Sequence, residues 1–287
     1  MRRITGISEM KAFSRKARKE GKLIAFVPTM GYLHEGHKRL LAEAKQLGGL
    51  VVLSVFVNPS QFGLNEDFAK YPRDMERDKA IAIECGVDVL FAPEVSDMYP
   101  VGYGTFVDVP ELADKLCGKS RPGHFKGVAT VVAKLFNIVM PHKAFFGLKD
   151  YQQQLVIKKM AKDMDMDVEV VAIETVREAD GLAMSSRNSY LSSEERRVAA
   201  IIPKAMAVAK DSVLRGESKG AAITEIVKKI MEKEPSVVID YVSVCDTDNL
   251  DNVEVIQDRA LLAMAVRLGK ARLIDNCLLE PKMTPRR

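Results

Sequence analysis

Two histidines, His34 and His37, stand three residues apart in the stretch 28–37, whose sequence is Pro-Thr-Met-Gly-Tyr-Leu-His-Glu-Gly-His. Residues 23–27 before it are apolar and predict a buried strand, and residues 38–47 after it repeat leucine and alanine at helical spacing. The histidines therefore lie at a strand-to-helix turn, where open α/β sheets bind ligands. Unpaired backbone N–H groups at the start of a helix attract phosphate. We expect this turn to bind a nucleotide.

Side chains at positions i and i+3 share one face of a helix, so both imidazoles can donate hydrogen bonds to the same phosphate. Gly31 and Gly36 carry no Cβ atom and let the backbone approach a ligand closely. A histidine at a helix start can also be a simple cap or a solvated side chain. The chain has only four histidines, and two of them share this turn, which favours a binding site.

Neutral polar side chains follow the next predicted strand. Asn58 and Gln61 come directly after the apolar run 51–57, and their amides suit a molecule with hydroxyl and carboxylate groups. On its own, an Asn-Pro pair is more simply a turn. Arg121 opens the string Arg-Pro-Gly-His-Phe before another predicted helix, and a lone arginine is equally well a surface charge.

Two further segments are cationic. Lys149 follows a predicted strand that ends at Gly147, and its compact positive charge suits a phosphate, while Asp150 can cap the helix that follows. Residues 184–188, Met-Ser-Ser-Arg-Asn, combine two hydroxyls with a guanidinium fork that fits phosphate oxygens. Taken alone, a solvated lysine before a cap and a serine-rich linker are the simpler interpretations.

The histidine turn resembles the nucleotide-binding signature of the adenylyl-transferring Rossmann superfamily, which includes nucleotidylyltransferases and class I aminoacyl-tRNA synthetases. Its longer form, Pro-Thr-Met-Gly-x-Leu-His-x-Gly-His, is similar to that of one family, the pantothenate synthetases (pantoate–β-alanine ligases). The strings at 58–62 (Asn-Pro-x-Gln-Phe), 121–125, 146–153 (Phe-Gly-x-Lys-Asp-x-x-Gln) and 184–188 match the same family. One departure is Leu148, where the family commonly has glutamate. The resemblance covers nearly the whole chain.

The resemblance implies ATP-dependent condensation of pantoate with β-alanine through a pantoyl-adenylate, with Mg²⁺ on the nucleotide and no protein ligand assigned to the metal. The implied catalytic set, with His37 as proton donor, is His37, His34, Lys149 and Arg187. The implied ATP-binding set is Met30, Gly31, Tyr32, Leu33, His34, Glu35, Gly36, His37, Gly147, Leu148, Lys149, Asp150, Val176, Met184, Ser185, Ser186 and Arg187. The implied substrate-binding set is Gln61 and Gln153, both on pantoate, with Asn58 and Arg121. The resembled enzymes are homodimers, so a homodimer is expected.

Composition excludes several other classes. Hydrophobic residues make up 47% and charged residues 29%, the balance of an ordinary globular protein. A net charge of +4 on 287 residues is too small to predict a nucleic-acid or membrane partner. The four cysteines are far apart and form no zinc or redox motif, and no apolar run reaches membrane-spanning length. With no apolar signal segment after the first residues, we expect a cytoplasmic enzyme.

The elements that must position these segments alternate along the chain. Strand, helix and strand across residues 23–57 form a βαβ unit, and further strands are expected at 87–92, just before Gly147 and at 168–173. We therefore predict an α/β fold in which a Rossmann-like parallel sheet forms an ATP- and pantoate-binding catalytic domain, residues 1–187.

A smaller α+β lid domain is expected over residues 188–287. Ser192 with Glu195 three residues on is a capping-box pattern, which predicts a long helix to about Arg215. A second helix and three strands follow, and the basic tail at 281–287 is expected to fray.

Two other functions stay open. A nucleotidylyltransferase would share the histidine turn but not the Asn-Pro-x-Gln-Phe or Met-Ser-Ser-Arg strings. A non-catalytic nucleotide sensor or RNA-binding module could lose phosphate-binding residues freely, whereas this chain keeps all of them. The sequence also has no basic stripe interleaved with aromatic residues to support RNA binding.

Overall fold

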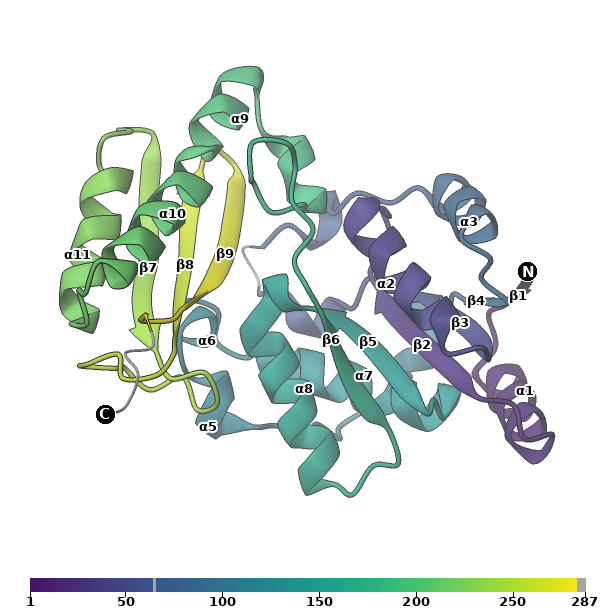
Figure 1. Ribbon diagram of the computed structural model, residues 1–287. Coiled ribbons are helices and arrows are strands. Elements are labelled where there is room, and N and C mark those ends of the chain that lie inside the picture. The colour runs from purple at the N-terminus through teal and green to yellow at the C-terminus, as the bar shows by residue number, and fades with distance from the viewer. Residues whose placement is uncertain (64–65, 283–287) are drawn as a thin grey trace. The chain divides into compact units, whose positions relative to one another are not determined.

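The computed structural model describes residues 1–63 and 66–282, which divide into two compact units (Figure 1). The first unit comprises Met1–Asp114 and Arg121–Thr175, and the second comprises Lys115–Ser120 and the chain from Val176 onward. Residues 176–187, expected in the first domain, therefore go with the second unit.

An ion pair to a buried carboxylate ties residues 176–187 to the second unit. Arg177 donates to both carboxylate oxygens of Asp275, at 2.7 and 3.0 Å, and Asp275 is only 3% exposed. Arg177 and Ala183 also form an antiparallel bridge, which folds this segment back on itself. Partners so far apart in sequence leave no local pattern, so the motifs alone predict the domain boundary at residue 187. The catalytic and lid roles of the two domains stay predictions.

The first unit is built on a parallel sheet with the strand order β1-β4-β3-β2-β5-β6. Its six strands are β1 (Arg2–Ile4), β2 (Ile24–Thr29), β3 (Leu50–Val55), β4 (Val89–Phe91), β5 (Lys143–Gly147) and β6 (Glu169–Ile173). Four of them are mostly or wholly buried, as expected for a sheet with helices on both faces. The predicted Rossmann-like parallel sheet is confirmed.

The strand order reverses at the centre of this sheet. From β2 the chain adds β3 and then β4 on one side, and later places β5 and β6 on the other. Ala25 and Phe26 of β2 pair with Lys143 and Ala144 of β5, and Figure 1 shows β2, β5 and β6 side by side. The carboxyl ends of β2 and β5 therefore meet at a topological switch point, where such sheets bind ligands.

Helices cover both faces of the sheet. Those of the first unit are α1 (Ile7–Lys19), α2 (Glu35–Gln46), α3 (Met75–Glu84), α4 (Val95–Met98), α5 (Pro110–Ala113), α7 (His124–Val139) and α8 (Tyr151–Asp163). Val27 and Leu53 form a cluster with Leu41 of α2 on one face, where α3 also packs. Phe26 and Val52 are fully buried and alternate with them, so they point to the other face. There α1 and α7 contact β2 and each other.

The second unit is a small α+β unit with the antiparallel order β7-β8-β9. Its elements are α6 (Cys117–Ser120), α9 (Ser193–Ala199), α10 (Ile201–Leu214), α11 (Gly220–Met231), β7 (Val237–Cys245), β8 (Ala260–Leu268) and β9 (Ala271–Leu279). Met206 of α10 and Val227 of α11 share a buried cluster with Leu262 and Met264 of β8. The two helices therefore pack on one face of this sheet (Figure 1).

The α6 segment lies early in the sequence yet belongs to the second unit. Arg272 of β9 donates to Asp240 at 2.6 Å and to Ser120 at 3.1 Å, while Cys117 and the Tyr241 hydroxyl lie 3.1 Å apart. These polar contacts across the sheet explain why six residues leave the first unit.

Three details differ from expectation. The short edge strand β1 pairs with β4 and was not predicted, because three residues are too few for a pattern. Asp150 occupies the N-cap position of α8, but among the described residues its side chain makes no capping bond. The capping box at Ser192 and Glu195 is confirmed, whereas the long helix is split at Ala200. Pro203 has no backbone N–H to donate and therefore sits in the first turn of a new helix.

Of the tail expected to fray, residues 283–287 lie outside the described residues. Over 1–63 and 66–282, none of the helices combines the length and the apolar character that crossing a bilayer requires.

One close approach in the first unit holds the segment after β3. The 3-10 turn at Pro59–Gln61 lies against the start of α7, where Gly127 faces the backbone of Ser60 and Gln61. A Cβ atom on Gly127 would lie 2.7 Å from the Gln61 Cα atom. Only glycine lets the turn and the helix approach this closely.

We expect Gly127→Ala to lower the free energy of unfolding by about 1–3 kcal/mol, because the methyl group overpacks the contact. This loss should appear even though alanine favours a helix by up to about 1 kcal/mol. Gly104→Ala is the matched control, since its Cβ would meet only the Gly102 carbonyl oxygen at 3.9 Å. Urea denaturation measures both, and equal stability of the two variants would contradict the close-packing argument.

Candidate active site

The histidine turn connects β2 to α2 through a strained backbone. Gly31 has φ +81° and Tyr32 has φ +53°, so two consecutive residues adopt the left-handed region. Gly31 donates its N–H to Thr29 Oγ1 at 3.2 Å, and Thr29 in turn donates to the Ser54 carbonyl at 2.8 Å. The turn is therefore anchored to the ends of both β2 and β3.

Asp78 of α3 holds this turn and was missed by the sequence analysis. Its carboxylate accepts the N–H groups of Tyr32 at 2.8 Å and Leu33 at 2.7 Å, and the residue is 1% exposed. Burial raises the pKa of this carboxyl, so keeping it ionised costs stability that the two hydrogen bonds partly offset. The Arg77 guanidinium lies 4.7 Å from the centre of the Tyr32 ring. The only sequence signal was an acidic residue within a partly apolar helix.

The two imidazoles cap the start of α2. Gly36 donates its N–H to His34 Nδ1 at 3.1 Å, and His34 donates its N–H to His37 Nδ1 at 3.2 Å. The ring centroids lie 4.0 Å apart. Because each Nδ1 accepts a hydrogen bond, each neutral ring carries its proton on Nε2. The pair therefore offers two N–H donors whose tautomer the helix cap fixes.

Both imidazoles are neutral at physiological pH. Burial, followed by the nearby Lys149 charge, lowers the pKa of His34 to about 4. Burial, His34 and Lys149 together hold the pKa of His37 well below its usual value. The Lys149 charge acts on both rings, so this residue, two positions after the end of β5, lies near the histidine turn, as the switch point requires.

The two glycines serve the turn itself. A Cβ atom on Gly36 would lie 2.8 Å from His34 Cε1, so glycine leaves room for the capping ring. A Cβ atom on Gly31 would lie 2.7 Å from Asp78 Oδ2 and 2.9 Å from Val55. Packing around the caps thus explains both glycines, in addition to the ligand approach expected from sequence.

The amides after β3 form a buried network next to the turn. Asn58 is 1% exposed and donates from Nδ2 to Gln61 Oε1 at 3.0 Å and to the Gly127 carbonyl at 3.1 Å. Gln61 Nε2 points to Met30 Sδ at 3.3 Å. Gln61 therefore faces the histidine turn, whereas the Asn58 amide hydrogens are used within the protein. Gln153 lies half-buried in the first turn of α8.

The Arg121 side chain forms an ion pair with Glu66. Its guanidinium donates to both oxygens of Glu66, at 2.6 and 2.5 Å, and lies 3.0 Å from His124 Nε2. His124 Nδ1 lies 2.8 Å from the Gln61 carbonyl, so the ring donates there and accepts from Arg121. The structure thus links Arg121 to Gln61 through the backbone, and direct substrate binding by Arg121 stays a prediction.

The serine–arginine loop, residues 184–188, belongs to the second unit and is held by hydrogen bonds within it. Ser185 caps the 3-10 turn at Ser186–Tyr190 by accepting the Arg187 N–H at 3.2 Å. Met184 donates its N–H to the Val176 carbonyl at 3.0 Å, and Asn188 donates to Glu178 at 2.6 Å. The roles of Val176, Met184, Ser185, Ser186 and Arg187 in ATP binding stay predictions.

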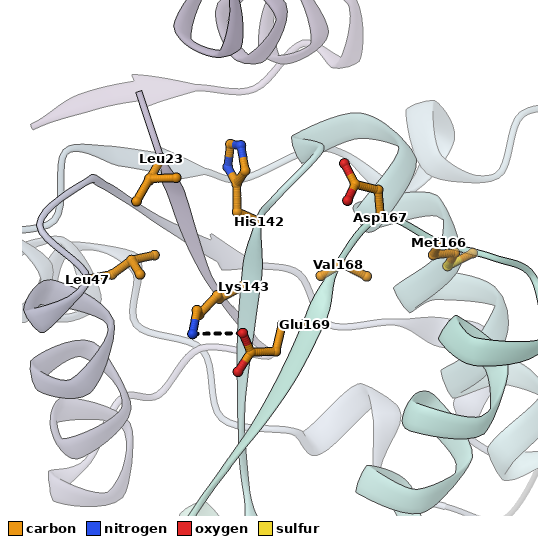
Figure 2. Close-up of a pocket in the computed structure, with 8 residues that line it drawn as sticks. All are labelled: Leu23, Leu47, His142, Lys143, Met166, Asp167, Val168 and Glu169. Atoms are coloured by element: carbon orange, nitrogen blue, oxygen red, sulfur yellow. Dashed lines mark ion pairs between the residues drawn. The ribbon is translucent and has the colours of Figure 1, made fainter. Parts of the chain in front are cut away.

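A shallow cavity of about 500 Å³ lies elsewhere in the first unit (Figure 2). Its lining includes Leu23, His142, and the ion-paired Lys143 and Glu169, whose charged groups are 2.7 Å apart. Lys143 and Glu169 begin β5 and β6, so the cavity lies at the amino ends of the strands, opposite the histidine turn. It is not the site that the switch point predicts.

Across 1–63 and 66–282, no group of three or more histidine, cysteine, aspartate or glutamate side chains could hold a metal ion.

Comparison with known proteins gives one consistent family. The family model described as "Pantoate-beta-alanine ligase" matches residues 2–278. The pantothenate synthetase of Geobacter sulfurreducens is 52% identical over 97% of this chain and 99% of its own length. That of Heliobacterium modesticaldum is 54% identical over 98% of this chain and its full length.

Solved structures agree with the sequence relatives. The crystal structure of pantothenate synthetase from Thermus thermophilus has a TM-score of 0.93 at 44% identity and covers 98% of this chain and 100% of its own. The pantoate-beta-alanine ligase from Francisella tularensis, complexed with "Beta-gamma ATP and Beta-alanine", has a TM-score of 0.79 at 34% identity, covering 97% of each chain.

We predict that Asp78→Asn exposes the turn to local opening. The amide nitrogen would face a backbone donor, so one of the Tyr32 and Leu33 N–H groups loses its acceptor. Hydrogen exchange at these two amides should accelerate by about tenfold or more, because a buried N–H group without an acceptor destabilises the closed turn by a corresponding free energy. Glu76→Gln on the exposed side of the same helix is the control. Unchanged protection of both amides would rule out the anchoring role.

The histidine pKa values also predict a pH dependence of stability. Between pH 6.5 and about 4, an unfolded His34 binds a proton that the folded one does not, so stability should fall as pH falls through this window. His34→Asn keeps an N-cap acceptor but removes the titration, and should flatten the dependence measured by urea denaturation. An unaltered slope in this variant would contradict the depressed pKa.

Proposed function

The chain belongs to the pantoate–β-alanine ligase family, and we propose that its histidine turn is where that family's reaction takes place. The enzyme condenses pantoate with β-alanine at the expense of ATP and gives pantothenate, AMP and pyrophosphate. The observation that carries the proposed site is the pair of fixed Nε2–H donors beside Lys149, at the switch point of a chain that matches the family model over residues 2–278.

The chemistry needs positive potential without a protein nucleophile. A pantoate carboxylate that attacks the α-phosphorus of ATP brings two anions together, and charge then leaves with pyrophosphate. Hydrogen-bond donors that are already in place around the phosphates lower this barrier, because they need not reorganise as charge develops in the transition state. His34 and His37 would donate from Nε2 to phosphate oxygens, and Lys149 would neutralise charge. The amine of β-alanine then displaces AMP from the pantoyl-adenylate, with both reactants held in line.

In the proposed reaction, His37 can donate a proton only when ATP is bound. In the unligated chain both imidazoles are neutral, because burial and Lys149 disfavour their charged forms. A bound triphosphate brings negative charge within reach of Nε2 and raises the pKa of the ring it contacts. His37 would therefore act first as a hydrogen-bond donor and gain acid character only when ATP is bound.

The remaining predicted residues complete the proposal. Gln61 and Gln153 would bind pantoate, with Asn58 and Arg121 supporting Gln61. The backbone and side chains lining the nucleotide would be Met30, Gly31, Tyr32, Leu33, Glu35, Gly36, Gly147, Leu148, Asp150, Val176 and Met184, with Ser185, Ser186 and Arg187 on the phosphates. The family resemblance over the histidine turn and four further strings supports these assignments, together with a homodimer and a cytoplasmic location.

Mg²⁺ fits as a companion of the nucleotide. It prefers phosphate oxygens and water to a protein cage, and the described part of the chain offers no cluster of three ligating side chains. We propose that the ion enters on the ATP phosphates, where it neutralises their charge.

A product assay tests the proposed reaction. The purified chain with ATP, pantoate and β-alanine should release pantothenate, AMP and pyrophosphate, and omission of either organic substrate should abolish pantothenate. Exchange of pyrophosphate into ATP should require pantoate and not β-alanine. Exchange without pantoate would instead favour a nucleotidylyltransferase, and no nucleotide turnover at all would favour a sensor.

We expect Lys149→Ala to reduce pantoate-dependent exchange by about 100-fold or more, as for loss of one preorganised charge stabiliser. Lys158→Ala, an exposed lysine on α8, is the matched control and should keep full exchange. Thermal unfolding of both variants should stay close to that of the parent chain. Near-normal exchange in Lys149→Ala would remove this residue from the mechanism.

A further inference from the structure

The side chain of Gln61 is held by a chain of hydrogen bonds that ends at Tyr99. The Tyr99 hydroxyl donates to Asn58 Oδ1 at 2.7 Å, and Asn58 Nδ2 donates to Gln61 Oε1 at 3.0 Å. Ser60 supports the middle of this chain, because its hydroxyl donates to Asn58 Oδ1 at 2.9 Å and lies 3.0 Å from the Tyr99 hydroxyl. All four residues belong to the first unit.

Two backbone groups fix the orientation of the Asn58 amide. The Gly127 carbonyl can only accept, and it lies 3.1 Å from one end of the amide, which must therefore be Nδ2. The Ser60 N–H can only donate, and it lies 3.3 Å from the other end, which must be Oδ1. The Gln61 atom beside Asn58 Nδ2 is then necessarily its acceptor, Oε1. Gln61 Nε2 is left facing away from the network.

Tyr99 completes the network as a donor. Its ring contacts Phe56 and Tyr103, with centroids 6.3 and 5.0 Å away, so the hydroxyl has a fixed position. Burial raises the pKa of Tyr99 to about 12, so the phenol keeps its proton over the whole pH range in which the enzyme would be assayed. Asn58 Oδ1 thus accepts from the Tyr99 and Ser60 hydroxyls. Inversion of the Asn58 amide would place the Nδ2 donor against these donors, which is unfavourable.

We propose that Tyr99 is a positioning residue for pantoate, which acts through Asn58 to hold the Gln61 amide with Nε2 toward the substrate. This inference rests on the proposed function, in which Gln61 binds pantoate. Nε2 now points to Met30 Sδ at 3.3 Å, and a thioether is a weak acceptor. A hydroxyl or carboxylate oxygen of pantoate is a better partner for the same hydrogen. The site therefore selects an acceptor at this position and disfavours an analogue that presents an N–H donor there.

Tyr99→Phe removes one hydroxyl and keeps the ring. Asn58 loses its shortest donor, so less free energy opposes inversion of the linked Asn58 and Gln61 amides, and the KM for pantoate should rise about fivefold, as expected for one neutral hydrogen bond. The KM values for ATP and β-alanine should stay within about twofold. Tyr103→Phe, the neighbouring ring, is the matched control and should leave all three unchanged. Ser60→Ala removes the second hydroxyl donor and should shift the same parameter less.

A double-mutant cycle separates positioning from a structural role. Gln61→Ala should itself raise the KM for pantoate, and adding Tyr99→Phe to it should cause no further rise, because the amide to be oriented is gone. A structural defect would instead add to the effect of Gln61→Ala and would raise the KM for every substrate. Either of those results overturns the inference, as does an unchanged KM for pantoate in Tyr99→Phe.

The same experiment shows which proposal fails. If Gln61→Ala raises the KM for pantoate but Tyr99→Phe does not, the positioning role of Tyr99 is wrong and the proposed function stands. If Gln61→Ala has no effect on pantoate, then the placement of Gln61 is wrong, and the role of Tyr99 falls with it.

Discussion

The backbone N–H groups at the start of α2 need acceptors that the helix cannot supply, and most of the site follows from how they obtain them. His34 accepts from Gly36, His37 accepts from His34, and Asp78 accepts from two residues of the preceding turn. Each imidazole uses Nδ1 as the acceptor in the cap. The fold therefore places the ring proton on Nε2 and fixes the direction of that N–H group. In the proposed function, helix capping and phosphate binding use the same two rings, because the cap at Nδ1 fixes the Nε2–H that would donate to a phosphate.

The strand order of the sheet places the positive charge of Lys149 near these imidazole donors. Placing β5 beside β2 brings Lys149 to the same edge as the histidine turn, although more than a hundred residues separate them. Lys149 helps to keep both rings neutral, since a second and third positive charge nearby would be costly in a buried site. In the proposed function, one lysine and two neutral donors would offer positive potential to a triphosphate at a lower cost in folding stability than three cations would incur.

Local patterns predicted much of this fold, and long-range contacts account for what they missed. The strand-to-helix turn and the capping box at Ser192 follow from residues adjacent in sequence, so they were predicted. Asp78 lies 45 residues from Leu33, and Arg177 lies 98 residues from Asp275, so neither contact has a sequence signature. The orientation of the Gln61 amide is also invisible in sequence, because it depends on the carbonyl of Gly127 and the hydroxyl of Tyr99. The assembly of site residues from both units stays a prediction of the motifs.

The polar groups around Gln61 are neutral or already paired, and the proposed reaction gives a reason. Pantoate must attack through its carboxylate, and a charge-assisted bond from an unpaired arginine would hold that carboxylate about twice as strongly as an amide does. Such a bond would stabilise the attacking anion before reaction and lower its reactivity. Glu66 occupies the Arg121 guanidinium, which still supports the Gln61 carbonyl through His124. In the proposed function, the Gln61 amide would orient pantoate and leave its carboxylate reactive, whereas a charged partner would bind the carboxylate more tightly before reaction without speeding the chemical step.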